Sequence, residues 1–292
     1  MDAGPFPTPS RAPSLLAPID RRAALLLIGG LAATPLAHAQ IKSGDDPDAS
    51  PQWLKVREAL FKDRPISTQA GEVIALETPR RAEDAAVVPV AVRAQFPQSA
   101  QRSIQRLWLI VDNNPSPISA VFQYTLDSGR ADIETRLRID EYGFVRAIAE
   151  TNDGKLWMAA NFVKASGGCS APPGKDPQAA LASLGRMKFR LEGEPRPRTP
   201  LLAQLMISHP NDSGMVMDQL TRQFTPAHFV RKVDVSYGGK LVLSADLDFS
   251  ISENPNLRFF FLPQGEGGEL KAEVVDSHDL KFDSAIKVNV GT

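Results

Sequence analysis

The pattern of hydrophobic residues changes from helical spacing to alternation a short way into the chain. Trp53, Val56, Leu60 and Phe61 fall on one face of a helix, so this spacing predicts a short helix with one buried side. From Val73 onward, apolar residues alternate with polar ones or stand in short runs. Such a pattern is typical of β-strands.

The alternating pattern predicts about seven strands in the first half of the chain. They cover residues 73–77, 86–94, 106–111, 120–125, 133–139, 145–151 and 155–162. Turn residues separate them, as in Asp112-Asn113-Asn114-Pro115, which we interpret as a structural turn, and Asn152-Asp153-Gly154, a strong hairpin signal. Many short strands without intervening helices predict a β-sandwich.

A second strand-rich region follows the first. Its predicted strands are residues 186–191, 201–208, 229–237, 240–249, 256–262, 269–276 and 279–290. Between the two regions, Asp176-Pro177 has the residues of a helix start and Gly185 those of a helix end. We interpret the run Phe259-Phe260-Phe261 as the contact between the two sandwiches.

The predicted fold class is therefore all-β, with two immunoglobulin-like β-sandwich domains in one chain. Short helices are expected at the N-terminus and in the linker. The expected boundaries are 50–165 for the first sandwich, 166–185 for the linker with its helix, and 186–292 for the second sandwich.

The first 39 residues have the pattern of an export signal. Arg21 and Arg22 precede the apolar stretch 23–31, and Ala37-His38-Ala39 is typical of a peptidase site. The apolar stretch is shorter than the roughly 20 residues that span a bilayer. The paired arginines resemble a twin-arginine signal, although ordinary secretory export is also open, and the expected location is the periplasm.

The composition excludes some classes of partner. The chain has 33 basic and 34 acidic side chains, for a formal net charge of −1. A nearly neutral chain without a basic stretch is not expected to bind nucleic acid or an anionic membrane surface.

Cys169 is the only cysteine, and it stands between small residues and glycines in the stretch 166–174. An unpaired cysteine in an oxidising compartment is a reactive thiol or an intermolecular linker. We therefore expect Cys169 to be exposed, with Gly167, Gly168 and Gly174 making its loop flexible.

Several motifs in both halves support a family resemblance. In the first half they are Ala86-Val87-Val88-Pro89-Val90, the stretch 111–117, Asp153-Gly154-Lys155-Leu156 and Ser166-Gly167-Gly168-Cys169. In the second half they are the stretch 207–214, Pro226-Ala227-His228-Phe229, Tyr237-Gly238-Gly239-Lys240 with Ser244-Ala245, and Asn254-Pro255-Asn256-Leu257. The chain resembles the two subunits of the SoxYZ sulfur carrier joined together, and in particular the fused SoxYZ-like carriers associated with quinoprotein dehydrogenases.

This resemblance implies a carrier that does not catalyse a reaction by itself. Sulfur-containing intermediates, such as those of thiosulfate oxidation, would be attached to Cys169 and presented to partner enzymes. The implied partners are periplasmic redox enzymes, either of the sulfur-oxidation type or a quinoprotein dehydrogenase with its c-type cytochrome. The alternative is a non-catalytic accessory protein for such a dehydrogenase, in which Cys169 carries no cargo.

The sequence departs from the carrier pattern after the cysteine. The carrier subunit normally ends within a couple of residues of its cysteine, whereas this chain continues for more than a hundred residues. A loop tethered at both ends, over residues 165–175, extends by roughly 15–20 Å at about 3.4 Å per residue. A deep, narrow partner tunnel would exclude such a loop.

Three histidines, His209, His228 and His278, are candidate ligands or bases. They lack a paired spacing such as His-x-x-x-His, and the chain has a single cysteine, so we expect no metal and no cofactor. His209 and His228 are interpreted as residues that fix a turn and a strand entrance. A flexible glycine loop would not hold a nucleophile against a base, so catalysis by this chain alone is not expected.

Overall fold

The computed structural model describes residues 46–172, 174, 177–218 and 221–291. The predicted export signal and the predicted helix cap Asp176 lie outside these residues. All described residues belong to one compact unit. Among them, no helix has the length and apolar character needed to cross a membrane.

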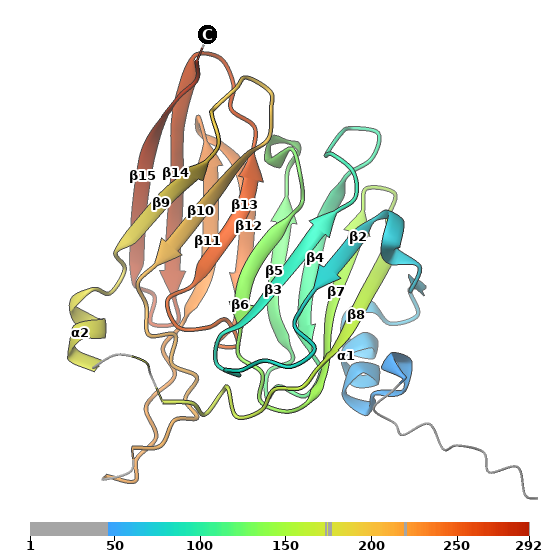
Figure 1. Cartoon of the computed structure of the whole chain (residues 1–292), viewed down its shortest axis with the longest axis vertical. Helices are drawn as coiled ribbons and strands as arrows, with labels where there is room; N and C mark the ends of the chain where they lie inside the picture. The colour runs from blue at the N-terminus through green and yellow to red at the C-terminus, as the bar shows by residue number, and fades with distance from the viewer. Residues whose placement is uncertain (1–45, 173, 175–176, 219–220, 292) are drawn as a thin grey trace, which may run out of the picture. The chain divides into compact units, whose positions relative to one another are not determined.

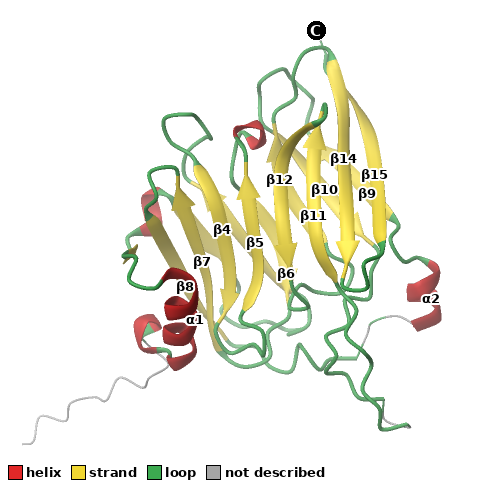
Figure 2. Ribbon diagram, turned by 180° about the vertical axis from the view of Figure 1, so that it is seen from behind, coloured by secondary structure: helices red, strands yellow, loops and turns green. Residues whose placement is uncertain are grey.

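The described strands form two sheets that pack face to face (Figures 1 and 2). The larger sheet has the order β1-β8-β7-β4-β5-β12-β11-β14-β15, and the smaller has the order β2-β3-β6-β13-β10-β9. The strands are β1 (Ile66–Ser67), β2 (Ile74–Glu77), β3 (Val88–Ala94), β4 (Ile104–Val111), β5 (Ile118–Tyr124), β6 (Ile133–Leu137), β7 (Gly143–Thr151), β8 (Leu156–Val163), β9 (Met187–Glu192), β10 (Leu201–Ile207), β11 (Val230–Tyr237), β12 (Lys240–Leu247), β13 (Asn256–Phe261), β14 (Gly267–Asp276) and β15 (Lys281–Asn289).

The predicted all-β, immunoglobulin-like fold class is confirmed, and every predicted strand is present. The two-residue strand β1, which pairs in parallel with β8, is the one described strand that the pattern did not predict. Two residues are too few to show an alternation.

Both sheets run without a break from the first half of the chain into the second. β5 pairs with β12 in the larger sheet, and β6 pairs with β13 in the smaller one. Phe259 and Phe261 are fully buried, and Phe259 lies opposite Ile133 of the first half. The phenylalanine run therefore lies at the junction as expected, but main-chain pairing joins the halves there as well as side-chain packing.

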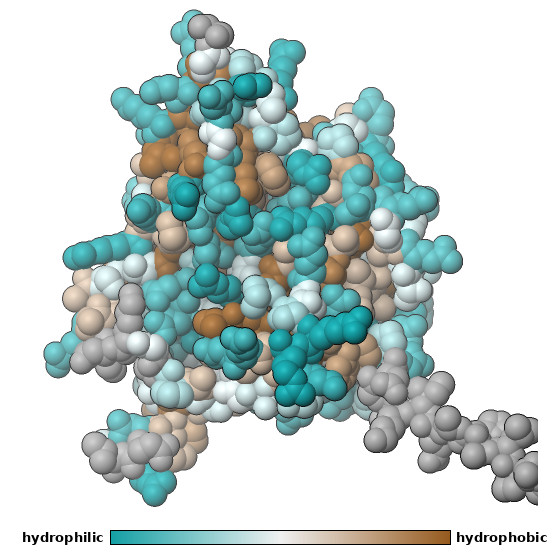
Figure 3. Space-filling view, viewed as in Figure 1, coloured by the Kyte–Doolittle hydropathy of each residue, from teal (hydrophilic) through white to brown (hydrophobic). Residues whose placement is uncertain are grey.

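The outer face of the smaller sheet is largely polar where the halves meet, as the space-filling view shows (Figure 3). Arg258 of β13 bonds Glu134 of β6 and Glu192 of β9, each at 2.6 Å, and Arg93 bonds Glu134 at 2.5 Å. The Arg258–Glu134 pair therefore links the two halves at the surface, and the other two pairs extend it within each half.

Short helices occupy the two ends of the first half, as expected. α1 (Pro51–Phe61) begins after Ser50, whose hydroxyl accepts from the Trp53 N–H, and it buries Trp53 and Phe61. It packs on the outer face of the larger sheet (Figure 2).

The linker helix α2 (Pro177–Ala182) is short, and Gly185 follows it with a positive φ of 74°. The 3₁₀ turns are η1 (Pro47–Ala49), η2 (Ala70–Glu72) and η3 (Leu126–Ser128).

A fully buried ion pair anchors the start of the described chain on the larger sheet. Arg146 of β7 donates to both carboxylate oxygens of Asp112, at 2.7 and 2.6 Å, and also to the carbonyl of Pro47 at 2.6 Å. Its guanidinium lies 4.5 Å from the centre of the Trp53 ring. This single side chain of β7 therefore contacts the residue that follows β4 as well as η1 and α1.

We expect Arg146→Met to lower the free energy of unfolding by about 3–5 kcal/mol, because it leaves the buried Asp112 carboxylate unpaired. Urea denaturation followed by circular dichroism measures the change. Glu194→Gln is the matched control, because it removes one partner of the exposed pair with Arg196 and should cost less than about 1 kcal/mol. Equal effects of the two substitutions would contradict the anchoring role.

Candidate functional site

Cys169 lies on the segment that leaves β8 and leads to α2, and its exposed fraction is 0%. The expectation of an exposed thiol is therefore wrong for this conformation. Ser166, Gly167 and Ser170 face solvent, whereas Gly168 and Cys169 turn inward. We call residues 166–172 the cysteine segment.

Main-chain hydrogen bonds hold the cysteine segment against the chain that follows β6. The N–H of Gly167 donates to the carbonyl of Asp140 at 2.8 Å, and the N–H of Gly168 donates to the carbonyl of Ile139 at 2.9 Å. The two segments are antiparallel, with Gly167 opposite Asp140 and Gly168 opposite Ile139. The next residue, Cys169, therefore lies beside Arg138.

The glycines permit close packing in this conformation. A Cβ on Gly168 would lie 2.1 Å from the carbonyl oxygen of Ala85, which no side chain tolerates. Gly167 has a φ of +80°, and Gly174 donates its N–H to Glu253 at 2.8 Å. In this conformation close approach requires a glycine at 168 and the left-handed φ favours one at 167, whereas the N–H that Gly174 donates is present in any residue except proline. That these glycines make the segment flexible remains a prediction. That Cys169 carries cargo remains a prediction.

The second half of the chain also holds the cysteine segment. Ser213 donates its hydroxyl hydrogen to the carbonyl of Cys169 at 2.5 Å and accepts from the N–H of Met215 at 3.2 Å. Since Asp140 and Ile139 come from the first half, both halves contribute to the position of the thiol.

Arg138 is the buried cation beside the thiol. Its Nη1 donates to the carbonyls of Asn211, Ile251 and Phe249, at 2.7, 2.9 and 3.1 Å. Burial lowers the pKa of Arg138, although the nearby negative charges partly compensate. This arginine connects the end of β6 to two segments of the second half.

The surroundings of Cys169 favour the neutral thiol. Burial, followed by the negative charge of Asp140 and to a lesser degree that of Asp248, raises the pKa of Cys169 to about 12, against the opposing effect of Arg138. A thiol reacts as its thiolate. The Cys169 thiol of the closed segment is therefore unreactive near neutral pH, and its reaction requires release of the segment.

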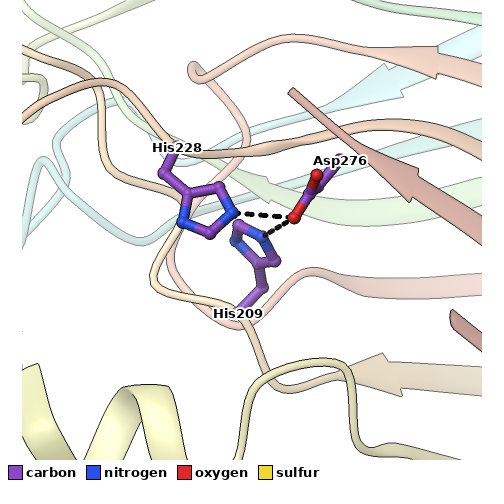
Figure 4. A group of neighbouring side chains, drawn as sticks. All are labelled: His209, His228 and Asp276. Carbon is purple, nitrogen blue, oxygen red and sulfur yellow. Dashed lines mark hydrogen bonds and ion pairs between the residues drawn. The ribbon is translucent and has the colours of Figure 1, made fainter. Parts of the chain in front are cut away.

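A second group of side chains lies close to this region, at the strand ends of the second half (Figure 4). His209 follows β10, His228 precedes β11, and Asp276 ends β14. His228 Nε2 lies 2.7 Å from Asp276 Oδ2, and His209 Nε2 lies 3.5 Å from the same oxygen. The ring of His278 stacks on that of His228, with centroids 3.9 Å apart. We call His209, His228 and Asp276 the histidine cluster.

Sequence reasoning placed the three histidines separately and missed their convergence. The residues are far apart along the chain, so no local spacing reveals them. The available signal was their shared position at predicted strand ends, which meet at one edge of a sandwich.

The histidine cluster has enough donors for a metal ion, but one hydrogen bond opposes this use. The N–H of Asn211 donates to His209 Nδ1 at 3.0 Å, so the proton of the neutral ring is on Nε2. A metal on Nε2 would move that proton to Nδ1, where it would face the N–H of Asn211. The absence of a metal site remains a prediction. The hydrogen bond from Asn211 now supports it, whereas the sequence supported it only by the spacing of the histidines.

The charges in the histidine cluster are unevenly distributed. Burial, together with the neighbouring His228, lowers the pKa of His209 to about 4. Burial alone would raise the pKa of Asp276, but hydrogen bonds from His228 and from the N–H groups of Leu280 and His278 hold it below its usual value. The arrangement favours a carboxylate beside a neutral His209.

Comparisons with protein families identify both halves. The model of the sulfur oxidation protein SoxY matches residues 57–169, and the model of the sulphur oxidation protein SoxZ matches residues 190–287. The chain is a fused SoxYZ-like protein. The SoxY match ends at Cys169, the only cysteine of the chain.

Other comparisons add little. No curated protein matches the chain. A superoxide reductase (neelaredoxin) from Ignicoccus hospitalis is 20% identical with a TM-score of 0.30, over 32% of this chain and 81% of that one. A putative superoxide reductase from Thermotoga maritima is 13% identical with a TM-score of 0.30, over 37% and 98%. A β-glycosidase from Bacteroides vulgatus is 9% identical with a TM-score of 0.23, over 79% and 26%. These likenesses are too weak to carry a functional argument.

The two families assign a coarse role. SoxY and SoxZ proteins are carriers or accessories that interact with sulfur-oxidation enzymes and are not catalysts themselves. A sulfur-oxidation carrier role for the fused SoxYZ-like chain is consistent with a thiol that two halves of one protein hold together.

We expect Gly168→Ala to open the cysteine segment, because the added Cβ overlaps the carbonyl of Ala85. The rate of iodoacetamide alkylation at pH 8 should rise at least about tenfold, since even about 1.4 kcal/mol of lost closure has that effect. Gly174→Ala is the control, because its Cβ would meet Glu253 at an ordinary 3.5 Å. An unchanged rate in Gly168→Ala would show that the packing does not control the thiol.

Proposed function

We propose that this protein is a periplasmic covalent carrier that holds sulfur-containing intermediates on Cys169 and presents them to partner redox enzymes. The observation that carries the proposal is the end of the SoxY family match at Cys169, on a segment that hydrogen bonds join to both halves of the protein. The export signal expected in residues 1–39 supports the location.

Release of the cysteine segment is the first step of the proposed cycle. Among the described residues, three hydrogen bonds join the segment to the rest of the protein, with Asp140, Ile139 and Ser213 as partners. At about 1 kcal/mol for each hydrogen bond, opening costs on the order of a few kcal/mol. A partner enzyme that binds the open segment supplies free energy of this size.

The proposed loading reaction is an oxidation that joins two sulfur atoms. With thiosulfate as cargo, the Cys169 thiol loses its proton to solvent and forms an S–S bond to the outer sulfur. Two electrons pass to an acceptor such as a c-type cytochrome, one at a time. The product is a cysteine S-thiosulfonate with one negative charge, which a partner enzyme then oxidises or hydrolyses.

Partner enzymes must approach a segment that is tethered at both ends. Its reach of roughly 15–20 Å suits a shallow cleft better than a deep tunnel. We therefore propose partners of the sulfur-oxidation type with open active sites, or a quinoprotein dehydrogenase and its cytochrome.

The deciding experiment is the intact mass of the protein purified from the periplasm of its native host, measured with and without reductant. We expect a reducible, sulfur-containing adduct that peptide sequencing maps to Cys169. A bare thiol that also resists loading by sulfide, or by thiosulfate with an oxidant, would overturn the carrier proposal.

The burial of Cys169 supports a second candidate, an accessory protein for a periplasmic quinoprotein dehydrogenase or its cytochrome. Cys169→Ser separates the two. The segment is held through main-chain groups of Gly167, Gly168 and residue 169, so the serine variant should keep the fold. Sulfur-compound oxidation in the host should be lost if the protein is a carrier, and nearly retained if it is an accessory.

A further inference from the structure

The histidine cluster lies at the beginning of the segment that contacts Cys169. From His209 the chain continues through Pro210, Asn211 and Asp212 to Ser213, whose hydroxyl binds the carbonyl of Cys169. The cluster and the thiol are thus connected by five consecutive residues of one chain.

Asn211 is the link between the two sites. Its N–H donates to His209 Nδ1 and its carbonyl accepts from Arg138. Its side chain donates to the carbonyl of Ile251 and accepts from the N–H of Val230. The residue has a φ of +47°, a left-handed conformation that an asparagine adopts at a cost of about 1 kcal/mol. These four hydrogen bonds maintain that conformation.

We propose that the histidine cluster is a proton-sensitive latch that keeps the cysteine segment closed while His209 is neutral and releases it when His209 gains a proton. The reason is the direction of one hydrogen bond. In the closed form His209 Nδ1 accepts from Asn211 N–H. A protonated ring has a donor on both nitrogens, so its Nδ1–H would face the N–H of Asn211. The bond is lost, and residues 210–213 lose the support that places Ser213 on Cys169.

The charges that face His209 strengthen this effect. Its ring contacts His228 edge to face, with centroids 4.6 Å apart, and His278 stacks behind His228. Asp276 is the carboxylate that both His209 and His228 approach. A positive charge on His209 is therefore disfavoured in the closed form, by burial first and by these neighbouring rings second.

Charged groups on the cysteine side act in the other direction. Arg138 interacts with Asp212 and Glu253, and the thiol is near Asp140 and Asp248. Burial raises the pKa of Asp212 and of Asp248, so the closed form holds protons on these groups more tightly and their protonation favours closure. The test range is pH 8 to pH 5, which spans the ordinary pKa of histidine.

The size of the effect follows from proton linkage. The pKa of His209 is about 4 in the closed form and returns toward 6.5 when the ring is released. The open form then binds the proton more strongly, so opening is favoured as the pH falls below 6.5. Between pH 8 and pH 5 the opening equilibrium should increase about 30-fold.

The test is the rate at which 4,4′-dithiodipyridine modifies Cys169, because this disulfide reacts with thiols from acidic to neutral pH. The Cys169 sulfur attacks one reagent sulfur, forms a mixed disulfide and releases one thiopyridone, whose absorbance is followed. The ratio of this rate to that of the urea-unfolded chain at the same pH gives the equilibrium constant for opening of the cysteine segment. The normalised rate should be about 30-fold higher at pH 5 than at pH 8. A flat profile would overturn the proposal.

Two variants identify the group that titrates. His209→Gln removes the proton site, so its normalised rate should change less than about threefold over the same range. His278→Gln changes an exposed ring that stacks on His228, and His278 is not a partner in the four hydrogen bonds of Asn211 described above, so this variant should retain the pH dependence. An equal rise in His209→Gln and in the unaltered protein would assign the effect to another group. Circular dichroism at each pH excludes global unfolding.

Hydrogen exchange measures the pH dependence of opening in the unaltered protein, so it tests the proposal even if His209→Gln does not fold. The amides of Gly167 and Gly168 are hydrogen-bonded in the closed form. After correction for intrinsic rates, their protection in the unaltered protein should fall by about 30-fold from pH 8 to pH 5. Constant protection would refute the latch. Neither readout involves cargo, so the latch and the carrier proposal can fail independently.

Discussion

The main-chain pairing between the two halves of the chain is the constraint on which the rest of the structure depends. β5 pairs with β12 and β6 pairs with β13, so each sheet continues through the junction. The halves cannot rotate against each other without breaking both pairings. The strands from which the segments of Cys169 and Ser213 leave are therefore held in fixed relation. Movement of the thiol must come from these connecting segments and not from rotation of the halves.

The alternation of apolar residues was sufficient to predict every described strand except the two-residue β1, because the longer strands bury one face in a shared core. It was not sufficient to predict which strands pair between the halves. Pairing of β6 with β13 joins residues more than a hundred positions apart, and the pattern of Phe259 and Phe261 is equally compatible with packing between separate sandwiches. The alternation specifies which face is buried, and the partner strand depends on the topology of the whole chain.

The error at Cys169 has a different physical origin. Glycine gives a chain more conformational freedom, and it also lets one backbone approach another closely. Gly168 uses the second property, since its Cα lies where any Cβ would meet the carbonyl of Ala85. Sequence alone does not distinguish these two uses. The convergence of His209, His228 and Asp276 was missed for a related reason, because strand ends that are distant in sequence become neighbours only when the sheets form.

A buried, protonated thiol suits the proposed carrier role and the proposed periplasmic location. An exposed lone thiolate would react with other thiols and oxidants without a partner enzyme, and free cysteines in such compartments tend to form intermolecular disulfides. Closure of the cysteine segment removes both the access and the negative charge that this reaction needs. The same hydrogen bonds set the free energy that a partner, or a proton at His209, must supply to open it. In this fused chain the cysteine is not near a free chain end, because its segment is tethered on both sides. The reactivity of the thiol therefore depends on the stability of the closed segment and not on the mobility of a terminal arm.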